Sequence, residues 1–259
     1  MDAFIIGELN LQNTTIVSKG NNNIIFVNSK KPVTVSDSKI IFEGSNSLLF
    51  LNESNEDLRM KAFLHNDSVL YIGKNASFHK KSDLHLICGE RKHIFIGDDT
   101  LFSTGIWLRT SDAHPIYNIE TTERINPSKS IIIGDHVWIG QGALILKGTI
   151  VGSGAIIAAK ALTSSNVFYS NSVYGGVPAK LIGQEGTACF CKRDVNLITV
   201  DENNYKDSIN DGVFVKTKNS LSFYNRLINF LEINHSTEES IEFFKHLSTD
   251  KNRLCIKST

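Results

Sequence analysis

The sequence predicts an all-β solenoid, a left-handed parallel β-helix with one protruding loop and a short helical extension at the C-terminal end. Two observations favour this fold class. Apolar residues recur at every sixth position over long stretches, and the chain has 18 glycines but only four prolines. A period of six fits neither a 3.6-residue helical turn nor simple strand alternation, but it fits short strands joined by tight corners.

The six-residue repeat occurs in two runs. The first contains six apolar residues in seven positions: Ile72, Phe78, Leu84, Glu90, Ile96, Phe102 and Leu108. The second contains Ile133, Ile139, Ile145, Val151, Ile157 and Thr163. If three hexapeptides make one coil, Ile133 should stack on Val151 and Ile139 on Ile157, about 4.8 Å apart. Ordinary buried strands of a sandwich or an α/β sheet are the alternative, but they do not explain one phase held through six hexapeptides.

The chain divides into three segments. Residues 1–70 carry short strands at irregular spacing, and we expect further, looser coils there. Residues 71–183 carry the regular β-helix, interrupted by a loop over residues 109–132. Residues 184–259 form a C-terminal extension in which helical spacing of apolar residues predicts a helical hairpin over 219–250. Ser236 followed by Glu239 is a capping box that marks the start of the second helix.

Composition excludes several classes of protein. The 27 basic and 27 acidic side chains leave no net charge, which argues against a general nucleic-acid binder or a polybasic membrane-surface protein. No stretch approaches the run of about 20 apolar residues that crosses a bilayer, and the first residues lack the layout of a signal peptide. We therefore expect a cytoplasmic protein without a membrane span. Four irregularly spaced cysteines indicate reduced thiols.

Four ordered elements resemble one known family. They are the phased hexapeptides, the loop Ser111-Asp112-x-His114-Pro115, the coil Ile133-Gly134-x-x-Val137-Trp138-Ile139-Gly140 and the closing Gly176-Val177-Pro178-Ala179-Lys180. Together they resemble the hexapeptide-repeat acetyl-CoA-dependent O-acetyltransferases. The loop segments 114–117 and 123–126 are similar in particular to the capsular polysialic acid O-acetyltransferases. The resemblance implies acetyl-CoA as co-substrate and a homotrimer with active sites between subunits.

His114 is the candidate general base. Acetyl transfer to a sugar requires removal of a proton from an alcohol, and a neutral imidazole is suited to this near physiological pH. Asp112, two residues earlier, is able to orient a ring nitrogen, and in the family the matching histidine is the base. The alternative is an ordinary solvated loop histidine. The other candidate residues of the loop, which would bind the acceptor, are Arg109, Tyr117 and Arg124.

Trp138 is the third candidate catalytic residue and also a candidate for the acetyl-CoA site. We place it at the hexapeptide position where neighbouring repeats carry small residues such as Ala143, Thr149 and Ala155, so its indole should project outward. The resemblance implies that it lines the thioester end of the groove or positions the acceptor. Packing against a neighbouring subunit is an alternative that is compatible with both roles. The coil near Gly140 is the candidate source of a backbone N–H for the oxyanion.

Coenzyme A requires a narrow groove with positive charge near its phosphates. Ala158 and Ala159 provide a smooth wall, and Lys160 and Lys180 provide charge nearby, although a solvated surface lysine is the alternative for each. Ser164 is the last candidate of this site. Ser164 and the serine that follows it stand where the family usually has Thr-Lys, so a common phosphate-contacting lysine is missing.

No metal site is predicted, although His79, His85, His93 and His136 are present. Residues six apart lie on different sides of the prism, so His79 and His85 cannot converge, and His136 is expected at a corner as a surface or groove residue.

Taken together, the motifs and the resemblance predict transfer of an acetyl group from acetyl-CoA to a hydroxyl of a surface polysaccharide, with sialic acid in a capsular polymer as the acceptor. Two alternatives remain: a small acceptor such as a sugar, an antibiotic or serine, or a non-catalytic glycan-binding β-solenoid.

Overall fold

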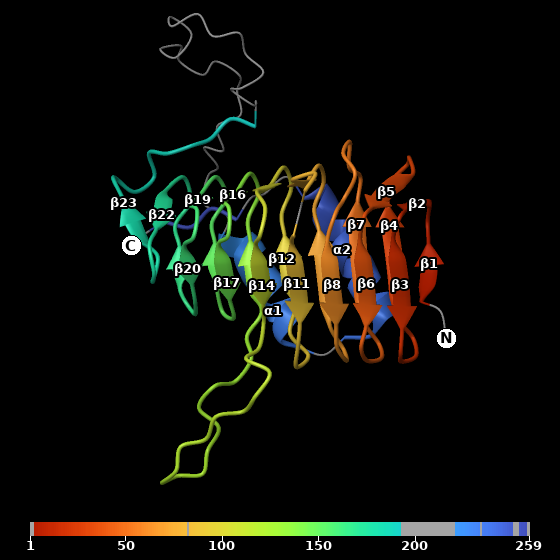
Figure 1. Ribbon diagram of the computed structural model, residues 1–259, viewed down its shortest axis with the longest axis horizontal. Helices are drawn as coiled ribbons and strands as arrows, with labels where there is room; N and C mark the ends of the chain where they lie inside the picture. Colours follow the sequence, from red (N-terminus) through yellow and green to blue (C-terminus); the bar gives the residue numbers. More distant parts are fainter. Residues whose placement is uncertain (1–2, 82, 193–220, 234, 251–253, 258–259) are drawn as a thin grey trace, which may run out of the picture.

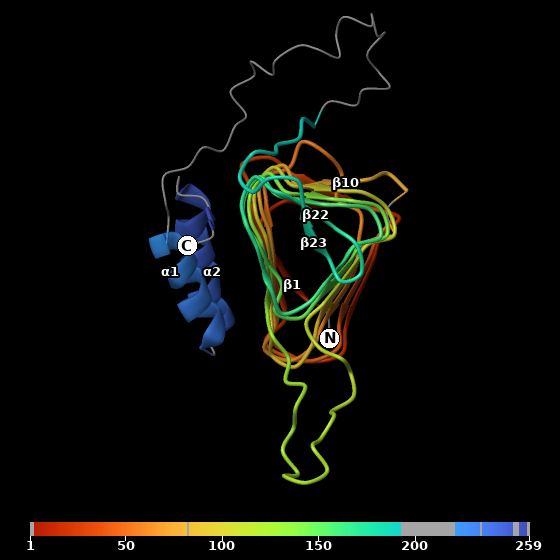
Figure 2. The same cartoon turned by 90° about the vertical axis from the view of Figure 1, so that its left-hand side faces the viewer.

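The computed structural model describes residues 3–81, 83–192, 221–233, 235–250 and 254–257. The chain folds as a left-handed parallel β-helix, which confirms the predicted fold class. Seen along its axis, the β-helix is a triangular prism with the helices against one side and one long loop leaving a corner (Figures 1 and 2). Among the described helices none is long and apolar enough to cross a bilayer.

Three large sheets form the sides of the prism. The first contains β1 (Phe4–Ile6), β4 (Ile24–Asn28), β7 (Leu48–Asn52), β9 (Val69–Ile72), β12 (Ile94–Ile96), β15 (Ile131–Ile133), β18 (Ile150–Val151) and β21 (Val167–Phe168). The second contains β3 (Thr15–Ser18), β6 (Lys39–Phe42), β8 (Lys61–Leu64), β11 (His85–Cys88), β14 (Trp107–Arg109), β17 (Leu144–Leu146) and β20 (Leu162–Thr163).

The third sheet contains β10 (Ser77–Phe78), β13 (Leu101–Phe102), β16 (Trp138–Ile139), β19 (Ile156–Ile157), β22 (Val173–Gly175) and β23 (Lys180–Ile182). A fourth, two-stranded sheet pairs β2 (Leu9–Gln12) with β5 (Val33–Ser36). Among the described strands, every pair is parallel except that of β22 with β23, which is antiparallel. This reversal ends the ladder of parallel strands in the third sheet.

The second repeat run has the predicted register. Ile133 pairs with Val151 and Ile139 pairs with Ile157, so each coil here consists of three hexapeptides. The apolar residues of this run are fully buried inside the prism. Adjacent coils approach so closely that a Cβ at Gly134 would lie 2.7 Å from the backbone nitrogen of Ser153, which explains a glycine there.

The first repeat run has longer coils than the three hexapeptides that we expected. Ile72 pairs with Ile96 and Phe78 pairs with Phe102, so each of these coils takes four hexapeptides. The extra hexapeptide is the corner around Glu90, whose side chain is exposed. On the second sheet the period is not kept, because Leu108 pairs with Leu86 and not with Leu84. The charged residue in an otherwise apolar series therefore marks a wider corner.

Corner residues adopt left-handed backbone conformations, as expected for asparagine and glycine. Positive φ angles occur at Asn22, Asn46 and Asp67 on successive coils of one corner. Their side chains form a ladder, since Asn22 Nδ2 donates to Asn46 Oδ1 (3.2 Å) and Asn46 Nδ2 donates to Asp67 Oδ1 (3.1 Å). Short polar side chains thus both tolerate this conformation and tie neighbouring coils together.

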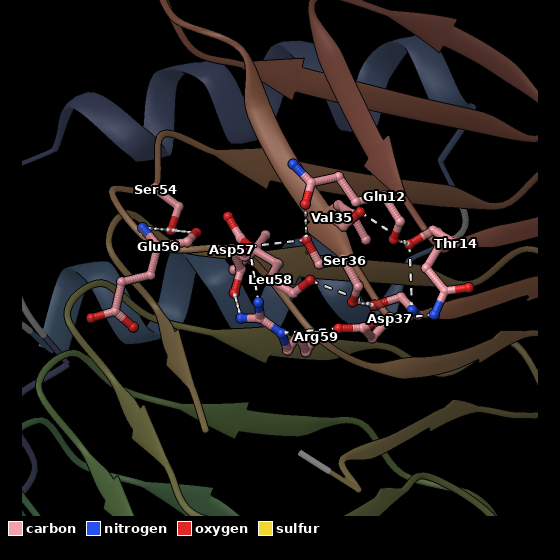
Figure 3. Close-up of polar contacts among 12 residues, drawn as sticks. Gln12, Thr14, Val35, Ser36, Asp37, Ser54, Glu56, Asp57, Leu58 and Arg59 are labelled. Atoms are coloured by element: carbon pink, nitrogen blue, oxygen red, sulfur yellow. Dashed lines mark hydrogen bonds and ion pairs between the residues drawn. The ribbon is translucent and has the colours of Figure 1, made fainter. Parts of the chain in front are cut away.

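Polar side chains also connect the N-terminal coils. Ser36 Oγ donates to Asp57 Oδ2 (3.0 Å), and Arg59 bridges Asp57 and Asp37 at 2.9 and 3.6 Å (Figure 3). Thr14 Oγ1 donates to the Val35 carbonyl oxygen at 3.0 Å in the same region. These contacts satisfy polar groups where the coils are least regular.

Two helices, α1 (Leu221–Glu232) and α2 (Thr237–Thr249), form the C-terminal extension. The predicted capping box is present: Ser236 Oγ accepts from the Glu239 N–H at 3.1 Å, and the Glu239 carboxylate accepts from the Ser236 N–H at 2.8 Å. The helices cover the outer face of the first sheet (Figure 2).

An aromatic ladder on that sheet receives the hairpin. Phe26, Phe50, Tyr71 and Phe95 stack on successive coils with ring centroids 4.6 to 5.3 Å apart. Phe244 of α2 is fully buried against this ladder, 4.9 Å from the Tyr71 ring and 5.7 Å from the Phe50 ring. Burial of these rings holds the helices on the prism.

Phe244→Ala should lower the free energy of unfolding by about 3 kcal/mol, because it removes a buried ring and leaves a cavity against the ladder. Urea denaturation followed by circular dichroism measures the change. Glu242→Ala, at an exposed position of the same helix, is the control and should have little effect. A loss below about 1 kcal/mol for Phe244→Ala would contradict the packing described above.

His93 gives the junction of prism and hairpin a pH dependence. Burial, with smaller contributions from Lys92 and His235, lowers the pKa of His93 from 6.5 to about 4. The neutral ring is required because its Nδ1 accepts from the Val69 N–H at 3.0 Å. The unfolded chain binds a proton at this residue below pH 6.5, whereas the folded chain does so only near pH 4. Stability therefore falls as the pH drops through this window.

The free energy of unfolding should decrease by about 2 kcal/mol more in the wild type than in His93→Gln between pH 7 and pH 4.5. Urea titrations of both proteins at the two pH values measure this difference, so that other titrating groups cancel. Equal pH dependence in the two proteins would show that His93 is not buried in its neutral form.

Candidate functional site

The long loop leaves the prism after β14 and returns at β15, so it projects from the corner between the second and first sheets (Figures 1 and 2). Its two sides pair with each other. The Ile125 N–H donates to the Ile116 carbonyl oxygen at 2.9 Å, and Tyr117 and Arg124 form an antiparallel bridge. The loop is thus a paired arm on a rigid scaffold, a common placement for functional residues.

His114 lies on the outgoing side of this arm and is exposed. Ala113, directly before it, has a φ of 67°. The Asp112 carboxylate forms an ion pair with Lys147 and accepts from Asn126 Nδ2 at 3.0 Å. The Lys147 ammonium lowers the pKa of Asp112, so this carboxyl is ionised at neutral pH. Among the contacts of the described residues, none joins Asp112 to the His114 ring.

Three residues at the base of the loop were not among the sequence candidates. Asn126 is buried, and Lys147 and Glu90 come from the coils on either side of the loop. Lys147 could have been found from the register of three hexapeptides per coil, since it follows Lys129 by one coil at the same corner. No pattern in the sequence distinguishes Asn126 from the other polar residues of the loop.

The candidate acceptor-binding residues already have partners. Arg124 forms two contacts with the Glu90 carboxylate, at 2.8 and 2.9 Å, and lowers the pKa of Glu90. Arg109 Nε donates to the Ser111 carbonyl oxygen at 2.9 Å. Tyr117 is exposed on the arm. Both arginines therefore stabilise the base of the loop in the unliganded chain, and Tyr117 faces solvent.

Trp138 projects outward from β16, as expected, but not from the position that the small residues occupy. It pairs with Leu101 and Ile156, whereas Val137 takes the place equivalent to Ala155. The prediction that aligned Trp138 with Ala143, Thr149 and Ala155 was wrong by one residue. The indole is 37% exposed, and its Nε1–H donates to Ser103 Oγ at 3.3 Å.

Phe190 packs beside this tryptophan. Its ring lies 5.9 Å from that of Trp138 and stacks on His136 at 4.3 Å, and its carbonyl oxygen lies 3.0 Å from His136 Nε2. His136 stands at a corner with a φ of 51° but is buried, whereas we expected a surface or groove residue. The segment that follows β23 therefore covers this corner.

Most of the candidate acetyl-CoA residues meet at the corner between the third and second sheets. Gly140 lies against the next coil, since a Cβ there would be 2.5 Å from the Ala159 nitrogen and 2.7 Å from the Ala158 carbonyl carbon. Lys160 follows at the same corner, and Lys180 in β23 pairs with Gly175, which lies beside Ala158. Ser164 follows β20 and lies at the next corner, below the protruding loop.

The backbone donors of this corner are not equivalent. The Gly140 N–H donates to the Ile157 carbonyl oxygen at 2.7 Å, so it is used by the ladder and is not available for an oxyanion. The Ala159 N–H has no acceptor among the hydrogen bonds of the described residues. Ala159, in the coil that follows Gly140, is therefore the better candidate donor at this corner.

One chain does not bring His114 and Trp138 together. The loop leaves the corner between the second and first sheets, and Trp138 lies on the third sheet, which forms the opposite side of the triangle (Figure 2). His79, His85, His93 and His136 also lie on separate elements, and no group of three or more metal-ligating side chains occurs among the described residues.

Comparison with known proteins agrees with this architecture. The family described as "Bacterial transferase hexapeptide (six repeats)" matches residues 130–164. A polysialic acid O-acetyltransferase of Neisseria meningitidis is 30% identical over 128 residues, which are 49% of this chain and 57% of that protein. A polysialic acid O-acetyltransferase of Escherichia coli O1:K1 / APEC is 40% identical over 52 residues, which are 20% of this chain and 17% of that protein.

Two solved structures share the fold over most of the chain. The polySia-specific acetyltransferase NeuO has a TM-score of 0.57 at 24% identity, covering 75% of this chain and 92% of that one. The polysialic acid O-acetyltransferase OatWY has a TM-score of 0.54 at 26% identity, covering 74% and 94%. The chain has the fold of the left-handed β-helix proteins, and its residues 130–164 match the transferase hexapeptide family.

Within that class, the resemblance to the hexapeptide-repeat O-acetyltransferases is confirmed, and the similar proteins are polysialic acid O-acetyltransferases. The sequence match spans just over half the length of the Neisseria protein.

Proposed function

We propose that the protein is an O-acetyltransferase that moves an acetyl group from acetyl-CoA to a hydroxyl of a surface polysaccharide, with sialic acid in a capsular polymer as the acceptor. The main support is the exposed His114 on an arm of a prism that resembles the polysialic acid O-acetyltransferases. The local basic groups Arg109 and Arg124 suit an anionic sugar, although the chain as a whole has no net charge.

His114 acts as general base in this proposal. Its neutral imidazole takes the proton of the sugar hydroxyl as the oxygen attacks the thioester carbonyl carbon. The oxyanion of the tetrahedral intermediate accepts from the Ala159 N–H, for which no acceptor occurs among the described residues. When the intermediate collapses, the carbon–sulfur bond breaks and the imidazolium returns its proton to the leaving thiolate. The products are the acetylated sugar and free coenzyme A.

Asp112 and Trp138 have supporting roles in the same reaction. Asp112 is paired with Lys147, so its carboxylate shapes the loop around His114 and keeps negative charge near the imidazolium. The exposed indole of Trp138 lines the thioester end of the groove. Coenzyme A lies along Gly140, Ala158 and Ala159.

Lys160 and Lys180 supply positive charge for the phosphates of coenzyme A. Neither ammonium group has an ion-pair partner among the described residues, so both are free to bind an anion. Ser164, at the neighbouring corner, contributes a hydroxyl where the family usually carries Thr-Lys after the run of small residues. Tyr117 and the two loop arginines contact the acceptor.

The active site is shared between subunits of a homotrimer. His114 and Trp138 lie on opposite sides of one prism, so a complete site needs the loop of one chain and the third sheet of another. The arm also exposes a group of large apolar side chains that suit contact with a second copy: Ile116 at 52%, Tyr117 at 56%, Ile119 at 95% and Ile125 at 60%. The acceptor polymer and acetyl-CoA imply a cytoplasmic enzyme.

Replacing His114 with Ala should reduce acetyl transfer at least a hundredfold, because the general base is lost. The rate is measured as free thiol released from acetyl-CoA in the presence of sialylated and neutral glycans, which also tests the small-acceptor alternative. His79→Ala, at an exposed histidine of the prism, is the matched control and should keep full activity. Full activity in His114→Ala would refute the mechanism, and no thiol release with any acceptor would favour a glycan-binding solenoid.

Mixed trimers test the shared site. His114→Ala and Trp138→Ala chains should each be inactive alone, but after unfolding and refolding together about a quarter of the sites would combine an intact His114 with an intact Trp138. Activity near that fraction is the expected outcome. If the mixture stays as inactive as the separate variants, both residues act within one chain or the trimer does not form as proposed.

A further inference from the structure

We propose that Asn126 and Lys147 are positioning residues that hold the backbone of His114 in the orientation needed for acetyl transfer. The inference rests on the proposed function, because it assumes that His114 is the base. It is carried by the hydrogen bonds at the base of the loop, which converge on the residues around His114.

The Asn126 side chain uses its whole hydrogen-bonding capacity. Its Nδ2 donates to the His114 carbonyl oxygen at 2.9 Å and to Asp112 Oδ2 at 3.0 Å. Its Oδ1 accepts from the Ile116 N–H at 2.7 Å and from Arg124 Nε at 3.2 Å. An amide side chain has two donors and two acceptor positions, so no capacity remains. One side chain thus holds the Asp112 carboxylate before His114 and the backbone at His114 and Ile116.

The conformation held in this way is a costly one. Ala113 has a left-handed φ of 67°, which is unfavourable for a residue with a β-carbon because the β-carbon crowds the following carbonyl oxygen. The bonds of Asn126 to Asp112 before it and to His114 after it keep this turn in place. Without them, Ala113 would relax to a right-handed or extended conformation, and the His114 ring would point in another direction.

Lys147 connects this arrangement to the prism. It follows β17 in the coil after the loop, and its ammonium contacts the Asp112 carboxylate and the Asn126 carbonyl oxygen, the latter at 3.0 Å. Its side chain is only 14% exposed, so the contact is shielded from solvent. Asp112 belongs to the outgoing side of the arm and Asn126 to the returning side. Lys147 therefore fastens both sides to one coil.

A second ion pair, of opposite polarity, fastens the arm to the coil before it. There the prism supplies the anion, Glu90, and the arm supplies the cation, Arg124, at 2.8 Å. On the coil after the arm, the prism supplies the cation and the arm the anion. If the arm were turned over, its cation Arg124 would face the prism cation Lys147, and its anion Asp112 would face the prism anion Glu90. The two pairs thus select one placement of the arm.

Asn126→Ala and Lys147→Met should lower kcat about tenfold or more while the KM for acetyl-CoA changes less than about twofold, since neither residue lines the coenzyme corner. Lys147→Arg should recover most of the kcat that Lys147→Met loses, because a guanidinium can make the same contacts. Lys61→Met is the matched control: Lys61 is also an ion-paired lysine on the second sheet, with Asp83 at 2.6 Å, and its loss should leave kcat unchanged. Thermal unfolding of each variant separates loss of positioning from loss of fold.

Two further measurements distinguish failure of this inference from failure of the proposed function. His114→Ala is assayed in parallel, and amide hydrogen exchange is followed over residues 110–130 in wild type and Asn126→Ala. An inactive His114→Ala together with a kcat within twofold of wild type in Asn126→Ala would overturn the positioning role alone. An active His114→Ala would overturn the proposed function. Unchanged exchange at the Ile116 amide would overturn the role of Asn126 in holding the loop, whatever the activity.

Discussion

The structure depends on one constraint, the stacking of each coil on the one before it at the spacing of hydrogen-bonded parallel strands. Backbone N–H and C=O groups of every coil must find partners above and below, and the side chains that point inward must be apolar and pack on those of the next coil. Ile133 over Val151 and Ile139 over Ile157 meet both demands at once. Corners, loop and hairpin are variations that this stacking permits, because it leaves the outside of the prism free.

The stacking is also what made the fold predictable. A period of six in apolar residues determines the register of the regular coils, and the capping box at Ser236 locates α2. The same period concealed the register of the earlier coils, because Leu84 and Leu108 share its phase although Leu108 pairs with Leu86. Nor does it show which outward side chains are covered. Phe50 and Tyr71 are outward-pointing strand residues that the sequence pattern does not distinguish from exposed ones. Their burial under Phe244 depends on a helix that comes much later in the chain.

The candidate site was predictable only in part for a related reason. His114 and Trp138 stand out because each departs from its surroundings, one on a loop that breaks the period and the other as a large ring in a coil of small and aliphatic residues. Asn126 and Lys147 do not differ in residue type from the polar residues around them in the sequence. Their importance comes from contacts between the two sides of a loop and the next coil, which depend on the path of the chain rather than on residue type. The one-residue error in placing Trp138 arose from counting along hexapeptides without the strand pairing that fixes the count.

The hairpin on the first sheet has a consequence for how such prisms can associate. A bare triangular prism offers three broad faces, and copies of it could meet through any of them or extend into open sheets of prisms. With the first sheet covered by α1 and α2, the described residues leave the second and third sheets and their shared edge for contact. The extension thus reduces the possible geometries of assembly. It leaves uncovered the edge between the third and second sheets, on which Gly140 and Ala159 lie.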